Sequence, residues 1–264
     1  MILSGISRVR VFVIFILTGQ GCTRMTQPVL RFGQVAAIRP DSILKYKDLH
    51  ASVWPEVLKG LTRFNIQNYS IHLKELESDR PYLFGYFEYT GKDFDGDMAG
   101  MLEDPVVKKW EDLAGGECLI DQSPDGKGLW WVEMEEVFYH AGQIGRKADE
   151  SKVQRYAMVI GLRPEMVESY SLLHKYPWTE VLDKITEGNI RNYSIYLSKL
   201  NDKFYLFGYF EYIGNDFEAD MTMIDNDPAT VAWMKFTDKA CQLPIPTRSA
   251  GEWWAIMEEI FYHR

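Results

Sequence analysis

The chain has 264 residues, of which 46% are hydrophobic and 14% aromatic, and its net charge is −9 when the histidines are neutral. This length allows one large domain or two of ordinary size, with enough apolar side chains for a buried core. Nucleic-acid binding needs clustered Lys and Arg side chains that neutralise phosphates, and the sequence contains no such basic run. The composition therefore argues against a nucleic-acid partner, and the aromatic side chains suit a small-molecule site.

Residues 1–24 have the pattern of a targeting segment. Two arginines precede the apolar run 11–17, and small residues then lead to Cys22. This order is typical of a secretory signal, and seven apolar residues are too few to span a bilayer, which takes about 20. Cys22 resembles the lipid attachment site of bacterial lipoproteins, although Gly19 stands where that motif prefers leucine. We expect an exported, periplasmic or membrane-anchored lipoprotein, whereas translation from Met25 would give a cytoplasmic protein.

The rest of the chain contains an internal sequence repeat of two copies. "LFGYFEYTGKDFDGDM" begins at Leu83 and "LFGYFEYIGNDFEADM" at Leu206, and twelve of the sixteen positions are identical. The offset between the copies is 124 residues up to the loop near Ser78 and 123 afterwards. A period this long indicates two whole domains rather than a solenoid. We expect a first domain at 31–140, a linker at 141–154 and a second domain at 155–263.

Within each copy the pattern predicts the order strand, helix, strand, strand, helix, strand. This is the ferredoxin-like arrangement, whose sheet has one face without helices. A second copy can cover that face, so we expect an α+β fold in which the repeat forms an internal dimeric α+β barrel, an intramolecular pseudo-dimer. The sequence leaves any higher oligomer open. The elements expected in the first copy are a strand at 33–39, a helix at 41–50 continued at 56–61 beyond Pro55, strands at 67–73 and 82–90, a helix at 93–113 restarted near Pro105, and a strand at 130–139.

The first helix of each copy bears a phenol, an imidazole and an indole at i, i+4 and i+8. Residues four apart share one face of a helix. An imidazole can exchange a proton near neutral pH, and a phenol can bind hydroxyl groups. The alternative is a core stripe that contains a satisfied histidine. The residues are Tyr46, His50 and Trp54 in the first copy, and Tyr170, His174 and Trp178 in the second.

Other polar positions recur in the strands. Tyr69 and Tyr193 lie on the second strand of their copies, where tyrosines usually serve packing. Glu88 and Glu211 lie among aromatic residues on the third strand, where each is an acid/base candidate, a hydroxyl acceptor or a solvated strand end. No phosphate loop, nucleophile elbow or zinc-ligand spacing is present, so we expect neither a cofactor nor a metal. The recurring pair Cys118 and Cys241 is expected to be buried.

Several of these stretches together resemble one known family. "HASVWPEVL" from His50, "NIQNYSIHL" with Tyr69, "EDPVVKKW" ending at Trp110 and "MEEVFY" near the end of the copy are similar to the L-rhamnose mutarotase family. The resemblance implies a dimeric α+β barrel that interconverts the anomers of L-rhamnose without cofactor or metal. It also implies proton donors and sugar contacts in each copy: His50 and His174 as donors, and Tyr46, Tyr69, Trp110, Tyr170, Tyr193 and Trp233 as contacts.

The sequence departs from the family in two places. The family has adjacent tryptophans on the second helix, and only Trp110 and Trp233 remain, preceded by Lys109 and Ala232. The second copy reads "HKYPWTE", so we expect its helix break to shift and His50 to carry the larger share of activity. The predicted function is an isomerase, a carbohydrate mutarotase acting on L-rhamnose or a related deoxy sugar. The alternatives are an exported, catalytically inactive carbohydrate-binding protein and a cofactor-free oxygenase of similar barrel shape.

Overall fold

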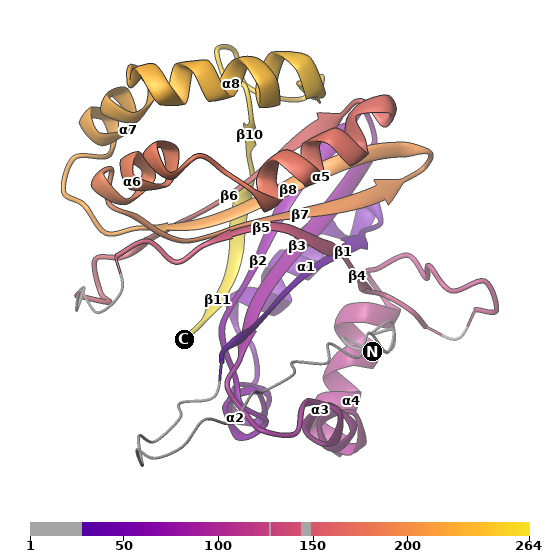
Figure 1. Ribbon diagram of the computed structural model, residues 1–264. Helices are drawn as coiled ribbons and strands as arrows, with labels where there is room; N and C mark the ends of the chain where they lie inside the picture. The colour runs from indigo at the N-terminus through magenta and orange to yellow at the C-terminus, as the bar shows by residue number, and fades with distance from the viewer. Residues whose placement is uncertain (1–27, 127, 144–148) are drawn as a thin grey trace, which may run out of the picture.

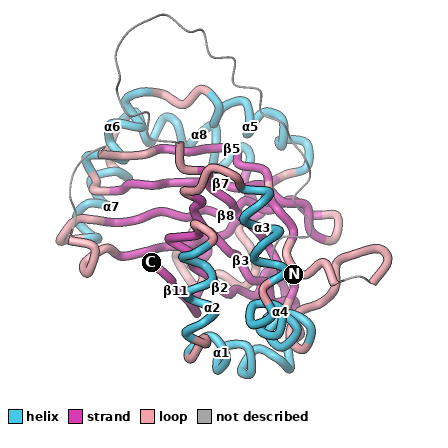
Figure 2. The backbone as a smooth tube through the Cα atoms, turned by 90° about the horizontal axis from the view of Figure 1, so that it is seen from below, coloured by secondary structure: helices cyan, strands magenta, loops and turns pink. Residues whose placement is uncertain are grey.

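The computed structural model describes residues 28–126, 128–143 and 149–264. In these ranges two antiparallel sheets face each other, and each carries its helices on the outer face (Figure 1). The perpendicular view in Figure 2 places the strands between two layers of helices. The predicted class, an α+β fold of two ferredoxin-like repeats, is confirmed. The predicted signal segment with Cys22 lies outside the described residues.

The two copies contain the same strands and helices in the same order, except for a π-helical turn in the first and the short strand β9 in the second. The first copy has β1 (Leu30–Ala37), α1 (Ile43–Ala51), α2 (Pro55–Arg63), β2 (Ile66–Glu77), β3 (Arg80–Tyr89), α3 (Phe94–Glu103), α4 (Pro105–Glu111), a π-helical turn (Asp112–Gly116), β4 (Val132–Glu133) and β5 (Glu135–His140). The second has β6 (Gln154–Leu162), α5 (Val167–Lys175), α6 (Thr179–Glu187), β7 (Ile190–Leu200), β8 (Lys203–Tyr212), α7 (Phe217–Asp225), α8 (Pro228–Cys241), β9 (Gln242–Leu243), β10 (Ala255–Ile256) and β11 (Glu258–His263).

The last strand of each copy crosses to the sheet of the other copy. β4 pairs with β1 of its own copy, but β5 pairs with β7, and His140 lies opposite Tyr193. In the same way β10 pairs with β6, whereas β11 pairs with β2 and His263 lies opposite Tyr69. The single strand predicted at 130–139 is therefore two short strands in two sheets. Alternation of apolar residues predicts a strand but does not say which strand it pairs with.

The break between the first two helices lies at the same position in both copies. Trp54 has extended backbone angles of φ −59° and ψ 133°, and Pro55 opens α2, where its missing N–H is not needed. Trp178 has φ −69° and ψ 135°, and α6 begins at the next residue. The expectation that the break shifts in the second copy is therefore wrong. Pro177 lies inside the connection between α5 and α6, where no helical hydrogen bond is lost.

The inner faces of the two sheets form a shared core. Its largest side chains come from both copies and include Phe84, Tyr196 and Phe207, all with at most 1% of their surface exposed. Separate cores lie between each sheet and its helices, and they contain the free thiols of Cys118 and Cys241, as predicted. None of the described helices combines the length and the apolar run that crossing a bilayer demands.

Candidate functional site

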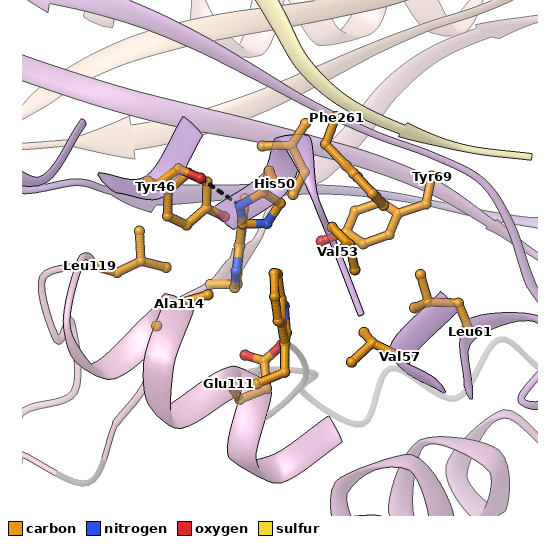
Figure 3. Close-up of a pocket in the computed structure, with 14 residues that line it drawn as sticks. Tyr46, His50, Val53, Val57, Leu61, Tyr69, Glu111, Ala114, Leu119 and Phe261 are labelled. Atoms are coloured by element: carbon orange, nitrogen blue, oxygen red, sulfur yellow. Dashed lines mark hydrogen bonds between the residues drawn. The ribbon is translucent and has the colours of Figure 1, made fainter. Parts of the chain in front are cut away.

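The first candidate site is a cavity between α1, α4 and the sheet. Figure 3 shows His50 inside it, with Tyr46 on one side and Tyr69 on the other. The imidazole Nδ1 lies 2.9 Å from the backbone oxygen of Tyr46. Because a carbonyl oxygen only accepts hydrogen bonds, Nδ1 carries the proton and donates it, which leaves Nε2 with a free lone pair. Burial lowers the pKa of His50 to about 4, so the ring is neutral at pH 7.

Aromatic rings hold His50 in place. The Tyr46 ring stacks on it with 4.1 Å between centroids, and Trp110 meets it edge-on at 5.4 Å. The carboxyl group of Glu111 also lines the cavity, and burial raises its pKa. The cavity has a volume of only about 30 Å³, enough for two or three water molecules.

The second cavity repeats this geometry on a larger scale. The Nδ1 of His174 lies 3.0 Å from the backbone oxygen of Tyr170, whose ring stacks on the imidazole at 3.9 Å. Burial lowers the pKa of His174 to about 4 as well. Tyr193 and Trp233 complete the predicted set of lining residues. The volume is about 350 Å³, within the range of about 300–1,000 Å³ typical of small-molecule sites. The second cavity is therefore the larger of the two, although the sequence predicts that His50 carries the larger share of activity.

The second cavity is also more polar than the first. Five lining residues have hydrogen-bonding side chains where the aligned residue of the first copy is apolar or glycine, and one position is reversed, with Met234 aligned with Glu111. The five are Asp225, Thr230, Thr237, Asp238 and Gln242, aligned with Leu102, Val107, Ala114, Gly115 and Leu119. Sequence reasoning missed them because it sought features shared by the copies, and the signal was in the positions where the copies differ.

Each cavity contains a ring from the opposite copy. Phe261, on the crossing strand β11, lies edge-on to His50 at 5.6 Å and also lines the first cavity. Phe138, on the crossing strand β5, lies edge-on to His174 at 5.7 Å and lines the second. Each candidate site is thus completed by the strand exchange.

Glu88 and Glu211 lie elsewhere, in a buried polar network between the two sheets. The amide nitrogen of Asn192 donates to Oε1 of Glu88 at 2.7 Å, and that of Asn68 donates to Oε1 of Glu211 at 2.7 Å. Both asparagines therefore link carboxylates of opposite copies. The Nε of Arg191 adds an ion pair to Glu211 at 2.7 Å. This location makes the two carboxylates inter-sheet hydrogen-bond acceptors and places neither among the residues that line the two cavities.

The histidine cavities do not form a metal-ligand cluster. In the described parts of the chain, no group of three or more His, Cys, Asp or Glu side chains is arranged to hold a metal ion. What each cavity offers is a neutral imidazole, tyrosine hydroxyls and apolar ring faces. These groups suit proton transfer on a small polyhydroxylated molecule.

The fold is a duplicated α+β barrel, and each half contains a cavity in which aromatic side chains surround a histidine. The sequence model described as L-rhamnose mutarotase matches residues 31–140 and 155–263. The chain belongs to the L-rhamnose mutarotase family and contains two copies of its domain.

Individual relatives agree with this assignment. The L-rhamnose mutarotases of Lactiplantibacillus plantarum and Mannheimia succiniciproducens are each 30% identical to this chain over 111 residues. Each match covers 42% of this chain and 98% of the relative. A crystal structure assigned as a monooxygenase from Fusobacterium nucleatum aligns with 89% of this chain and 94% of its own, at 12% identity and a TM-score of 0.49.

Proposed function

We propose that the protein is a carbohydrate mutarotase, an isomerase that interconverts the anomers of L-rhamnose or a related deoxy sugar. The observation that carries the proposal is a neutral, oriented histidine in an aromatic cavity in both copies of the family domain. Tyrosine hydroxyls beside the imidazole supply hydrogen bonds to sugar hydroxyls, and the tryptophan ring supplies an apolar wall.

The chemistry needs only proton transfer. A base takes the proton from the anomeric hydroxyl O1 while an acid protonates the ring oxygen O5, and the C1–O5 bond breaks to give an open-chain aldehyde. Rotation about C1–C2 presents the other face of C1, and O5 attacks it as O5 gives its proton back to the acid and the other proton returns to O1. Because Nδ1 is protonated, the imidazole first accepts a proton at Nε2 and later donates it. General acid–base catalysis of this kind contributes about 10²–10⁴-fold.

We further propose that the two copies act as the intramolecular equivalent of a dimer. The exchange of β5 and β11 supports this, because each cavity takes one ring from the other copy. From the pattern at residues 1–24 we propose export and lipid attachment at Cys22.

The competing proposal is a carbohydrate-binding protein without catalysis. Saturation-transfer NMR on mixtures of the anomers of L-rhamnose and of L-fucose separates the two functions. A mutarotase transfers saturation between the α and β anomer signals at a rate proportional to protein concentration. A binding protein broadens both signals and leaves their exchange at the rate of protein-free buffer, which would contradict the proposed activity.

A further inference from the structure

We propose that Asp238 is the second proton-transfer residue of the second cavity, where it works with His174 on the anomeric end of the sugar. This proposal rests on the proposed mutarotase activity and names a carboxyl group at a position where the first copy has none, although Glu111 lines the first cavity from another position. Gly115 is the aligned residue there, so the two cavities are chemically unequal.

Asp238 lies on α8, one of the helices that border the second cavity. Its carboxyl group lines the same cavity as His174 and Tyr193. One oxygen, Oδ1, accepts a hydrogen bond of 3.0 Å from the hydroxyl of Thr237, which orients the carboxyl group. Burial and, after it, the charge of Asp238 raise the pKa of the Tyr193 hydroxyl, so the carboxylate is close to a predicted sugar contact.

Two neighbouring polar groups complete the site. The Oε1 of Gln242 accepts a hydrogen bond of 2.6 Å from the indole nitrogen of Trp253, which leaves the amide nitrogen of Gln242 as a donor. Beside it, the buried Tyr170 hydroxyl makes no hydrogen bond of normal geometry to any described residue. Buried polar groups are normally paired, so an unpaired hydroxyl in a cavity of this size is suited to bind a polar ligand.

The acid–base properties of the pair are complementary. Burial and, less strongly, the charge of Asp225 in the same cavity raise the pKa of Asp238 from 3.8 to about 6 against the lowering effect of the Thr237 hydrogen bond, so part of the carboxyl population stays protonated toward pH 7. His174 is neutral at that pH. The protonated carboxyl group can therefore donate to O5 while Nε2 of His174 accepts the proton of O1. In the reclosing step Asp238 takes back the proton of O5 and His174 returns its proton to O1, so the pair ends as it began.

The pH dependence of anomer exchange tests the role of Asp238. Exchange in L-rhamnose is measured by saturation-transfer NMR from about pH 5 to about pH 8 for the wild type, Asp238→Asn and Asp238→Glu. We expect the wild-type rate to fall as the pH rises through about 6, because the acid loses its proton. Asp238→Asn should lower the rate about 10²-fold and remove this dependence, while sugar affinity changes little. Asp238→Glu should restore a pH-dependent rate. Asp183→Asn, which alters an exposed carboxylate of α6 outside the cavity, is the matched control.

A second measurement locates the sugar. Met158, Met221 and Met234 line the second cavity, and the described residues that line the first include no methionine. L-Rhamnose added to protein with ¹³C-labelled methionine methyl groups should shift these three signals. Unshifted methionine signals at saturating L-rhamnose would show that the sugar does not bind in the second cavity.

The experiments distinguish failure of the proposed function from failure of the role of Asp238. A wild-type protein without anomer exchange would overturn the proposed function and the role of Asp238 together. A folded Asp238→Asn variant with the wild-type rate and pH profile would overturn the role of Asp238 alone.

Discussion

The packing of the two sheets predicts an energetic coupling between Gly33 and Tyr196. Gly33 lies on β1, and a Cβ added to it would stand 2.4 Å from Cγ of Tyr196, on β7 of the facing sheet. The two ring carbons next to Cγ would be only 2.6 Å away. The ring is 1% exposed and packs near Phe84 at 6.1 Å, so it has little room to retreat. Gly33→Ala should therefore overpack the inter-sheet core.

The size of the effect follows from two opposing contributions. Overpacking of a tight core costs about 1–3 kcal/mol of the free energy of unfolding. Alanine is favoured over glycine by about 0.5–1 kcal/mol in a strand, because it loses less conformational entropy. We expect Gly33→Ala to lower the free energy of unfolding by about 1–2 kcal/mol, as measured by urea denaturation of the full chain.

The equivalent pair of residues suggests a substitution that should offset the cost of Gly33→Ala. The residues aligned with Gly33 and Tyr196 are Ala157 and His72, so a methyl group is already present where the facing ring is smaller. Tyr196→His should therefore absorb most of the cost of Gly33→Ala, with a coupling of about 1 kcal/mol in the double-mutant cycle. Additive effects, or a Gly33→Ala variant as stable as the wild type, would refute the close packing of the two sheets at this point.

Three further predictions follow from the fold and the sequence. The free energy of unfolding should fall as the pH drops from 6.5 to about 4, because burial lowers the pKa values of His50, His72 and His174 to about 4, 3 and 4, and the unfolded chain takes up these protons first. Urea denaturation at several pH values would contradict this if stability stayed constant. A fragment 28–140 should self-associate or bind a hydrophobic dye, because its last strand and inner sheet face lack their partners; a compact monomer in analytical ultracentrifugation would argue against interdependence. Intact mass of the protein from the native membrane fraction should show a mature chain that begins with acylated Cys22, and an unacylated chain that begins at Met25 would exclude that route.

Much of the architecture follows from local patterns. The sequence repeat indicates two copies of one domain, the alternation of apolar residues indicates the strands, and Pro55 marks the break before α2. The fold class and most elements could therefore be predicted. The stripe of Tyr46 and His50 could be placed in a cavity because residues four apart share one helix face. These features depend on neighbours in sequence.

The remaining features depend on contacts between distant residues. Nothing local distinguishes a last strand that stays in its own sheet from one that crosses, so the ring of Phe261 beside His50 could not be predicted. Glu88 was an acid/base candidate because it lies among aromatic residues, but its side chain meets Asn192 of the other sheet. Asp238 was missed because its role depends on the larger space around His174, and volume is a property of the packed chain.

The central claim is that neutral histidines in the two cavities exchange the anomers of a deoxy sugar. The most direct measurement is the rate of anomer exchange in saturating L-rhamnose for His50→Asn, His174→Asn and the double variant, with circular dichroism as the fold check. Asparagine keeps hydrogen-bonding capacity but cannot cycle a proton near neutral pH. We expect His174→Asn to remove the larger share of the protein-dependent rate and the double variant to remove nearly all of it, with little loss of sugar affinity. A folded double variant that exchanges anomers at the wild-type rate would contradict the claim.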